Sequence, residues 1–320
     1  MIGRKALLVE PRRFEIMDVN EEINSDQVLI KIASCGLCNW ELNFWKGKLN
    51  YLGYPHPLGH EYAGTVVAVG KNVKDFQEGD KVSSISGFGG FADYVAADAD
   101  KVIKLKSDID TKYVLGEPQK CVITVLRAAD AQPGDYGIVL GCGPMGQWCI
   151  QALGCKYLSG LIAIDIDDKK LAKAKKYGAT AVINSAKEDV EAKVREYTGG
   201  HMADFVIEGT GLPMLLNQAQ LYLRTSGRGK LVLMSAYEDV CREFDFRKAI
   251  DKSIEILVAH PGHSLDAMDD LRRAVNYINN GTFYVKEMIS HEFGLTQINR
   301  AFDMLEHKPK DYLKGLVYPD

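Results

Sequence analysis

One glycine-rich segment constrains this chain more than any other feature of its sequence. Residues 141–146 are Gly-Cys-Gly-Pro-Met-Gly, preceded by an apolar run at 136–140 and overlapping a helical pattern at 144–153. In a strand–turn–helix unit, the first glycine makes a tight turn and the second lets a pyrophosphate approach the backbone. The third glycine allows the helix to pack closely on the strand. The segment predicts a dinucleotide site formed by Gly141, Gly143, Pro144, Met145 and Gly146.

An acidic residue farther along the chain supports this interpretation. Asp165 ends the next apolar run, at 161–165, which is the place about 20 residues on where such sites carry an acid. A carboxylate there accepts hydrogen bonds from the adenosine ribose and repels a 2′-phosphate, so NAD is favoured over NADP. Lys169 and Lys170 could bind such a phosphate, but their helical pattern indicates a solvated helix face instead.

Two different patterns divide the chain. Residues 1 to about 118 contain short apolar or alternating runs separated by Gly, Pro and Asp, which is typical of a partly closed barrel or sandwich. These runs lie at 5–9, 27–32, 64–69, 81–85 and 92–95. From about residue 120, apolar strands alternate with helices, which predicts a parallel sheet covered on both faces. Its strands are expected at 136–140, 161–165, 181–184, 205–208 and 230–235, and its helices at 144–153 and 169–177.

The last part of the chain, 283–320, loses this alternation. It combines a strand-like stretch, a helix expected at 297–305 and a final strand expected at 314–318. We therefore expect an α/β protein with one domain formed by 1–120 plus 285–320 and a second domain formed by 121–284.

Composition excludes several classes of function. The 320 residues suffice for two domains, and 39 Lys+Arg against 43 Asp+Glu indicate neither a nucleic-acid nor an anionic membrane partner. No apolar run approaches the roughly 20 residues of a membrane span, and the first residues do not resemble a signal peptide. The odd number of cysteines, 7, argues against a disulfide framework. We expect a cytoplasmic protein.

A second cluster contains potential metal ligands. Cys38, His60, Glu61 and Glu117 offer a thiolate, an imidazole and carboxylates, which zinc accepts in tetrahedral geometry. Three such ligands and an open fourth position would make a catalytic site. Their spacing fits no short zinc signature, so by spacing alone a buried cysteine and a hydrogen-bonded core histidine are an equally good interpretation.

The order of the motifs resembles a known family. Five motifs follow one another in the sequence. They are Cys35-Gly-Leu-Cys38, Gly59-His-Glu-Tyr-Ala-Gly64, Gly79-Asp-Lys-Val82, Gly116-Glu-Pro118 and the turn at 141–146, and the resemblance they carry covers nearly the whole chain. This order is similar to that of the zinc-dependent medium-chain dehydrogenases, in particular the sorbitol and threonine dehydrogenase branch. The resemblance implies a GroES-like β-rich catalytic domain and a doubly wound Rossmann domain.

The resemblance also implies roles for individual residues. Cys38 and His60 match the zinc ligands of the family. Glu61 matches a carboxylate that ligates or borders the metal, and Glu117 matches a carboxylate that ligates the metal or holds a water. Which glutamate completes the site stays open. Lys314 matches a position where relatives place a basic residue near the cofactor pyrophosphate, although an exposed strand lysine is the simpler interpretation. Thr124 matches a position beside the nicotinamide. A homodimer or homotetramer is expected on the same ground.

The chain departs from the family at the proton path and at a metal-binding lobe. Relatives often carry Ser or Thr two residues after the ligand cysteine, to pass the substrate proton toward solvent, and here Trp40 stands there. Glu41 stands where an Asp is common, and Asn43 stands where relatives sometimes carry a histidine of the relay. Either Glu117, Glu61 or a bound water takes the proton instead, or the chemistry differs. The four clustered cysteines of the family's structural zinc lobe are missing, which predicts one zinc per chain.

These features together predict a zinc- and NAD-dependent oxidoreductase. Zinc would lower the pKa of a substrate hydroxyl, and the alcohol carbon would pass hydride to the nicotinamide. The substrate is expected to be a small secondary alcohol such as a polyol, sugar or sugar derivative. Aromatic residues that could stack on it, or simply fill the core, are Trp40, Phe44 and Trp45.

Three alternatives remain open from the sequence. An L-threonine 3-dehydrogenase-like enzyme belongs to the same branch and cannot be separated here. A metal-free quinone or enone reductase is disfavoured by the presence of Cys38 and of the pair His60 and Glu61. A non-catalytic NAD-binding protein is favoured only by Trp40 at the relay position.

Overall fold

The computed structural model describes residues 1–154, 157–237, 240–260 and 263–320. These residues form two compact units, one made of 1–120 with 271–320 and the other of 121–270. The boundaries fall within two helices, α2 (Glu117–Ala129) and α8 (Ala267–Asn279). The second boundary therefore lies earlier in the chain than the expected position at residue 285.

The unit formed by 121–270 contains a six-stranded sheet in which every neighbouring pair is parallel. Its strand order is β11-β10-β9-β12-β13-β14, so the order along the chain reverses between β9 and β12. This is the doubly wound arrangement of a dinucleotide-binding fold, as the sequence predicted. The strands are β9 (Tyr136–Leu140), β10 (Gly160–Asp165), β11 (Ala181–Asn184), β12 (Phe205–Glu208), β13 (Lys230–Leu233) and β14 (Glu255–Val258).

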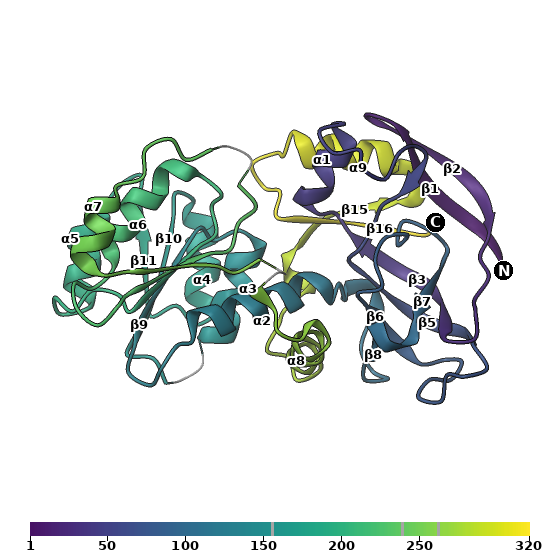
Figure 1. Cartoon of the computed structure of the whole chain (residues 1–320), viewed down its shortest axis with the longest axis horizontal. Helices are drawn as coiled ribbons and strands as arrows, with labels where there is room; N and C mark the ends of the chain where they lie inside the picture. The colour runs from purple at the N-terminus through teal and green to yellow at the C-terminus, as the bar shows by residue number, and fades with distance from the viewer. Residues whose placement is uncertain (155–156, 238–239, 261–262) are drawn as a thin grey trace. The chain divides into compact units, whose positions relative to one another are not determined.

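Helices cover both faces of this sheet, which explains its continuous apolar runs. Helices α3 (Pro144–Leu153) and α4 (Asp168–Lys176) pack on one face, and α5 (Val190–Tyr197) and α6 (Leu216–Tyr222) pack on the other (Figure 1). A fifth helix, α7 (Phe246–Lys252), precedes β14. Because both faces are buried, all four residues of β12 are inaccessible to solvent and no polar alternation appears.

The other unit is built from two sheets. A seven-stranded sheet has the order β15-β16-β3-β5-β6-β8, with β7 paired to β3, and a three-stranded sheet has the order β2-β1-β4. Short helices α1 (Leu42–Trp45) and α9 (Ile298–Glu306) belong to this unit. The strands are β1 (Ile2–Glu10), β2 (Arg13–Asn20), β3 (Gln27–Gly36), β4 (His56–Pro57), β5 (Tyr62–Val69), β6 (Lys81–Ser84), β7 (Tyr94–Asp98), β8 (Val102–Lys104), β15 (Ile289–Gly294) and β16 (Lys314–Tyr318).

The C-terminal tail belongs to this β-rich unit. Strand β16 pairs antiparallel with β3 and parallel with β15, which places Leu316 opposite Gly36. Aromatic side chains join the tail to the first hundred residues, because Phe302 packs against Phe14 of β2, Trp45 of α1 and Phe91 of the loop before β7, with ring centroids 4.9 to 5.7 Å apart. Within the described residues, no helix has both the length and the apolar character needed to cross a membrane.

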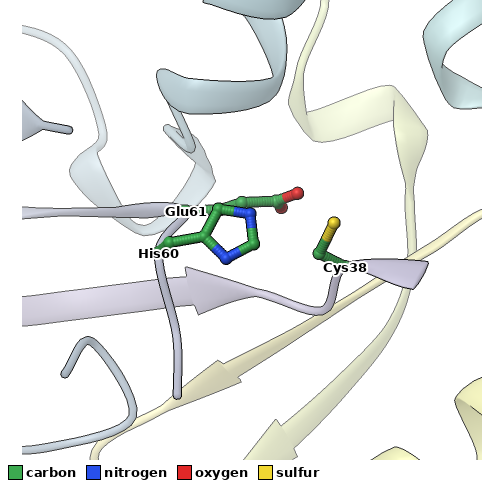
Figure 2. Close-up of side chains that lie close together, drawn as sticks. All are labelled: Cys38, His60 and Glu61. Atoms are coloured by element: carbon green, nitrogen blue, oxygen red, sulfur yellow. The ribbon is translucent and has the colours of Figure 1, made fainter. Parts of the chain in front are cut away.

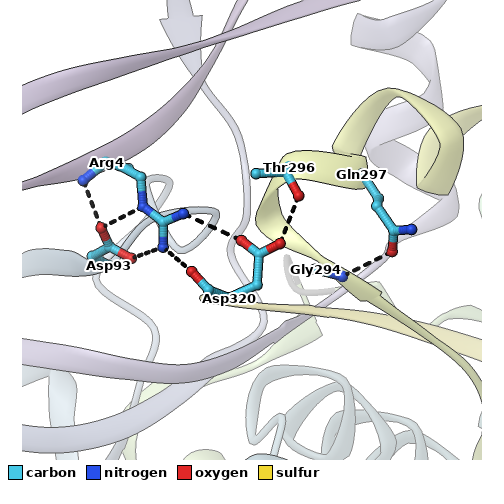
Figure 3. Close-up of polar contacts among 6 residues, drawn as sticks. All are labelled: Arg4, Asp93, Gly294, Thr296, Gln297 and Asp320. Carbon is cyan, nitrogen blue, oxygen red and sulfur yellow. Dashed lines mark hydrogen bonds and ion pairs between the residues drawn. The ribbon is translucent and has the colours of Figure 1, made fainter.

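A charged cluster fastens the two ends of this unit to each other (Figure 3). Arg4 donates from Nε and Nη2 to the two carboxylate oxygens of Asp93, at 3.0 and 2.9 Å, and also to Asp320. Thr296 Oγ1 donates to Asp320 Oδ2 at 2.6 Å. Because the guanidinium is bidentate and partly shielded from water, this pair contributes more than an ordinary surface ion pair.

Replacing Asp93 with Asn is expected to lower the free energy of unfolding by about 1 kcal/mol at neutral pH. Burial alone would raise the pKa of Asp93, but the hydrogen bonds and charge of Arg4 lower it below its ordinary value. The stabilisation is therefore present above the unfolded-state pKa and is lost as the pH falls through the lower folded-state pKa.

Urea unfolding of both proteins, measured from neutral to acidic pH, tests this expectation. The exposed Asp18 provides a control, since Asp18→Asn removes a carboxylate from the same unit without breaking such a pair. The difference in unfolding free energy between the unaltered protein and Asp93→Asn should shrink at low pH. A difference that stays the same would contradict the stabilising role of the Arg4–Asp93 pair.

Candidate functional site

Three potential metal ligands meet at the ends of two central strands, β3 and β5, in the larger sheet of the β-rich unit (Figure 2). Cys38 follows the end of β3, and His60 and Glu61 immediately precede β5. Strands β3 and β5 pair antiparallel with Cys35 opposite Tyr62, so the end of one lies beside the start of the other. One ligand atom from each of the three side chains lies within 4.8 Å of the others. The strand pairing thus supplies the proximity that the spacing along the chain did not reveal.

A buried carboxylate orients the imidazole of His60. Glu41 Oε1 accepts from His60 Nδ1 at 2.9 Å and from the backbone N–H of Gly59 at 2.7 Å, and Glu41 is fully buried. Because Nδ1 is engaged, Nε2 is the nitrogen available to a metal, as in other carboxylate–histidine–metal arrangements. Burial would lower the pKa of His60, but Glu41 and Cys38 raise it well above its ordinary value. The sequence identified Glu41 only as a departure from the family pattern.

Glu61 is shared between this cluster and a buried lysine. Lys314 Nζ lies 2.6 Å from Glu61 Oε2 and 2.8 Å from Oε1, and both residues are almost fully buried. A Cβ on Gly36 would lie 2.1 Å from Glu61 Oε2, so a larger residue there would displace the carboxylate from its present position. Burial would lower the pKa of Lys314, but Glu61 and Cys38 raise it above its ordinary value. The simpler interpretation of Lys314 as an exposed strand lysine is therefore wrong.

Glu117 lies at the margin of the cluster. It is the first residue of α2, and its Oε2 is 3.9 Å from His60 Nε2. Its other oxygen, Oε1, accepts from Nζ of the buried Lys120 at 3.1 Å. This places Glu117 near the metal-facing nitrogen of His60 but outside the group of three close ligand atoms.

The aromatic side chains expected near the substrate separate into two groups. Phe44 and Trp45 are 0% and 3% exposed and belong to the hydrophobic core, which disfavours contact with a substrate. Trp40 is only partly buried and lies edge-on to His60, with ring centroids 5.8 Å apart. Of the three, Trp40 alone lies against a candidate metal ligand.

Phe88 joins Trp40 beside His60 and was not singled out from the sequence. Its ring is parallel to that of Trp40 at 5.9 Å and edge-on to His60 at 5.9 Å. The flanking Gly87 and Gly89 have φ of 100° and 118°, which other residues rarely adopt. The signal in the sequence is therefore this phenylalanine between two glycines, in the segment where the family's zinc lobe is missing.

The glycine-rich turn of the other unit has the geometry that its sequence predicts. Gly141 has φ of 96°, and a Cβ on Gly146 would lie 2.0 Å from the carbonyl oxygen of Gly141. A Cβ on Gly143 would meet nothing within 4 Å, so the backbone there is open to an approaching group. Pro144 and Met145 begin α3, whose N-terminus faces the same turn. These residues fit a pyrophosphate.

Asp165 lies beside this turn, at the end of β10. Its Oδ2 accepts from the backbone N–H of Cys142 at 2.7 Å and its Oδ1 from that of Asp167 at 3.0 Å. Lys169 is exposed on α4, as a solvated helix face requires. Thr124 is fully buried and donates to Asp270 Oδ2 at 2.9 Å. The structure therefore joins Asp165 to the turn and gives Thr124 a buried partner in α8.

Comparison with known proteins assigns both units to described families. Residues 24–107 match the alcohol dehydrogenase GroES-like domain, and residues 144–280 match the zinc-binding dehydrogenase domain. The chain is 30% identical to (R,R)-butanediol dehydrogenase of Bacillus subtilis (strain 168), over 66% of this chain and 71% of that protein. It is 26% identical to sorbitol dehydrogenase of Halalkalibacterium halodurans, over 92% of each chain.

The fold is also found among solved structures. An oxidoreductase/dehydrogenase of unknown specificity from Escherichia coli, ECK1772, superimposes with a TM-score of 0.89 at 27% identity, covering 100% of both chains.

Replacing Glu41 with Ala is expected to weaken zinc binding by about 10- to 100-fold, because the imidazole loses the partner that orients it. Transfer of zinc from the purified protein to a chromophoric chelator measures this affinity. Glu41→Gln is the matched control, since its amide oxygen can still accept from His60 and Gly59, and it should lose much less. Equal zinc affinity for Glu41→Ala and the unaltered protein would refute the orienting role.

Proposed function

This chain belongs to the zinc-type medium-chain alcohol dehydrogenase family, and on that basis we propose that it is a zinc- and NAD-dependent dehydrogenase of a polyol, sugar or related secondary alcohol. The observation that carries the proposal is the convergence of Cys38, His60 and Glu61 within 4.8 Å, with Glu41 behind the imidazole. The reaction is hydride transfer between the cofactor and the alcohol carbon, in either direction.

The residues of this cluster fit a zinc ion. A thiol, an imidazole nitrogen and a carboxylate are donors that zinc accepts, and three protein donors leave a position for substrate. Cys38 and His60 would hold the metal, with Glu61 as a third or bordering donor that Lys314 holds in place. Zinc bound there supplies a Lewis acid that polarises the substrate oxygen. A metal-free reductase would have no use for this donor set.

Glu117 is the best-placed group to receive the substrate proton. Trp40 carries no hydroxyl, and Lys314 Nζ lies within 2.8 Å of both carboxylate oxygens of Glu61. Glu117 also pairs with a lysine, but Lys120 contacts its Oε1, while its Oε2 lies 3.9 Å from His60 Nε2. Glu117 lies near His60 Nε2 and is oriented by Lys120, so its carboxylate can accept a proton at the margin of the cluster. This selects one of the three routes that the sequence left open.

The aromatic rings of Trp40 and Phe88 beside His60 favour a substrate with an apolar C–H face. Trp40 and Phe88 form a parallel stack that is partly buried, and the turn after Phe88 is fixed by hydrogen bonds from Gly89 and Gly90 to Leu58 and Gly59. Such rings pack well against the C–H face of a polyol or sugar. We therefore place this stack, and neither Phe44 nor Trp45, next to the substrate.

The cofactor is proposed to be NAD. The turn at 141–146 would hold the pyrophosphate, and Asp165 beside it would accept hydrogen bonds from the adenosine ribose and repel a 2′-phosphate. Lys314 and Thr124 are less direct candidates, because the structure gives them Glu61 and Asp270 as partners.

The proposed location rests on the free cysteines, and the proposed assembly rests on the resemblance to the family. Six free cysteines in the described part of the chain suit a reducing compartment, so we propose a cytoplasmic location. We also propose a homodimer or homotetramer with one zinc per chain.

Cys38→Ala and His60→Ala are expected to lose zinc and turnover while NADH still binds, because the glycine-rich turn belongs to the other unit. Elemental analysis, fluorescence titration with NADH and a panel of polyols with NAD provide the three measurements. His307→Ala, which removes an exposed histidine of the same unit, is the control. Full activity in either ligand variant would rule out the proposed metal centre.

Asp165→Ala is expected to weaken NADH binding by about tenfold while NADPH binding holds or improves, since a ribose acceptor is lost and repulsion of the 2′-phosphate is removed. Titration with each reduced cofactor measures both affinities. An equal loss for the two cofactors would show that Asp165 only braces the turn through Cys142.

A further inference from the structure

A buried carboxylate lies where the strand order of the parallel sheet reverses. Glu208 is the last residue of β12 and pairs in register with Leu140 of β9, directly before Gly141. It is fully buried. Ligands of doubly wound sheets bind outside the carboxyl ends of the strands at this reversal, so Glu208 borders the cofactor crevice.

Three donors surround this carboxylate. Its Oε1 accepts from the backbone N–H of Thr210 at 2.7 Å and from the Thr210 hydroxyl, and its Oε2 accepts from the Tyr237 hydroxyl. All three hydrogen bonds are donated to the carboxylate oxygens of Glu208. Among the described residues, no lysine or arginine forms an ion pair with Glu208, so its negative charge is not cancelled by a neighbouring cation.

The loops around Glu208 are joined to the glycine-rich turn. Gly209 N–H donates to the carbonyl of Leu140 at 2.8 Å, and Met234 N–H donates to the carbonyl of Glu208 at 3.0 Å. A Cβ on Gly141 would lie 2.9 Å from Thr210 Cγ2. Tyr237 comes from the loop after β13, so Glu208 links the loops that follow β12 and β13.

The position of Asp165 indicates which half of the cofactor lies near Glu208. Asp165 ends β10, on one side of β9, and would hold the adenosine ribose, while the turn after β9 would hold the pyrophosphate. A dinucleotide that crosses β9 in this direction places its nicotinamide over β12 and β13. The two halves of the crevice thus carry different carboxylates.

We propose that Glu208 places a fixed negative charge near the nicotinamide and so favours the cationic oxidised ring over the neutral reduced ring. This inference rests on the proposed NAD-dependent function and adds a residue that sets the relative affinity for NAD⁺ and NADH. A charge in a buried, weakly screened position acts over longer distances than one in water, so direct contact is not required. Tyr237 and Thr210 hold the carboxylate in place.

Equilibrium binding of NAD⁺ and of NADH to the zinc-loaded protein, measured by calorimetry, tests the proposal. Glu208→Gln should raise the Kd for NAD⁺ by about tenfold while the Kd for NADH changes by less than about twofold. The amide can still accept from Thr210 and donate to the Tyr237 oxygen, so the hydrogen-bond network is retained. Glu208→Asp, which keeps the charge, is the matched control and should preserve the ratio of the two Kd values.

An equal loss of affinity for both cofactors in Glu208→Gln would overturn the proposal and leave Glu208 as a brace between loops. If that variant does not fold, Tyr237→Phe decides, because it removes a donor and keeps the charge. The ratio of the Kd for NADH to the Kd for NAD⁺ should then stay the same or increase. A decrease of this ratio by about threefold or more would overturn the proposal. If the unaltered protein binds neither NAD⁺ nor NADH, the proposed function fails, and this inference fails with it.

Discussion

The buried carboxylate of Glu41 is the interaction on which the candidate metal centre depends. It accepts from both the imidazole of His60 and the backbone of Gly59, and so it fixes the side chain and the chain direction at the start of β5. Both hydrogen bonds go to Oε1, and the buried Oε2 has no hydrogen-bond partner among the described residues. Because an unpartnered buried oxygen is costly, the two bonds to Oε1 are needed to keep the carboxylate in place. The neighbouring Cys38 precedes the same short helical turn, Asn39–Glu41, so both candidate ligands are positioned by one segment.

Charge balance in this part of the β-rich unit gives a second constraint. Glu61 is paired with Lys314, and Glu117 with Lys120. Burial and the charge of Glu61 raise the pKa of the Cys38 thiol. The charges of His60 and Lys314 act in the opposite direction. Binding of a divalent ion by the Cys38 sulfur would stabilise the thiolate and release the thiol proton.

Local patterns were predicted well from the sequence, and contacts between distant segments were not. The strand, turn and helix around Gly141 depend on neighbouring residues, and the structure has β9 and α3 at the expected positions. Cys38 and His60 meet only because β3 pairs with β5, which no spacing along the chain shows, so the resemblance to a family was needed. Lys314 was misjudged because its partner, Glu61, is far away in sequence.

Composition and periodicity could not show which of several similar residues lie beside the candidate site. Trp40, Phe44 and Trp45 are close in sequence and equally aromatic, but two of them fill the core and one lies beside His60. Phe88 and Glu208 carry no motif of their own. The roles proposed for them rest on backbone geometry at Gly87 and Gly89 and on the reversal of strand order at β12, which are properties of the fold.

X-ray absorption at the zinc edge of the protein, purified without added metal or chelator, tests the central claim most directly. The account predicts one zinc per chain with a single sulfur at about 2.3 Å, from Cys38, and nitrogen or oxygen neighbours at about 2.0–2.2 Å. A protein that contains no zinc and takes up none, or a zinc ion surrounded by several sulfur atoms, would contradict it.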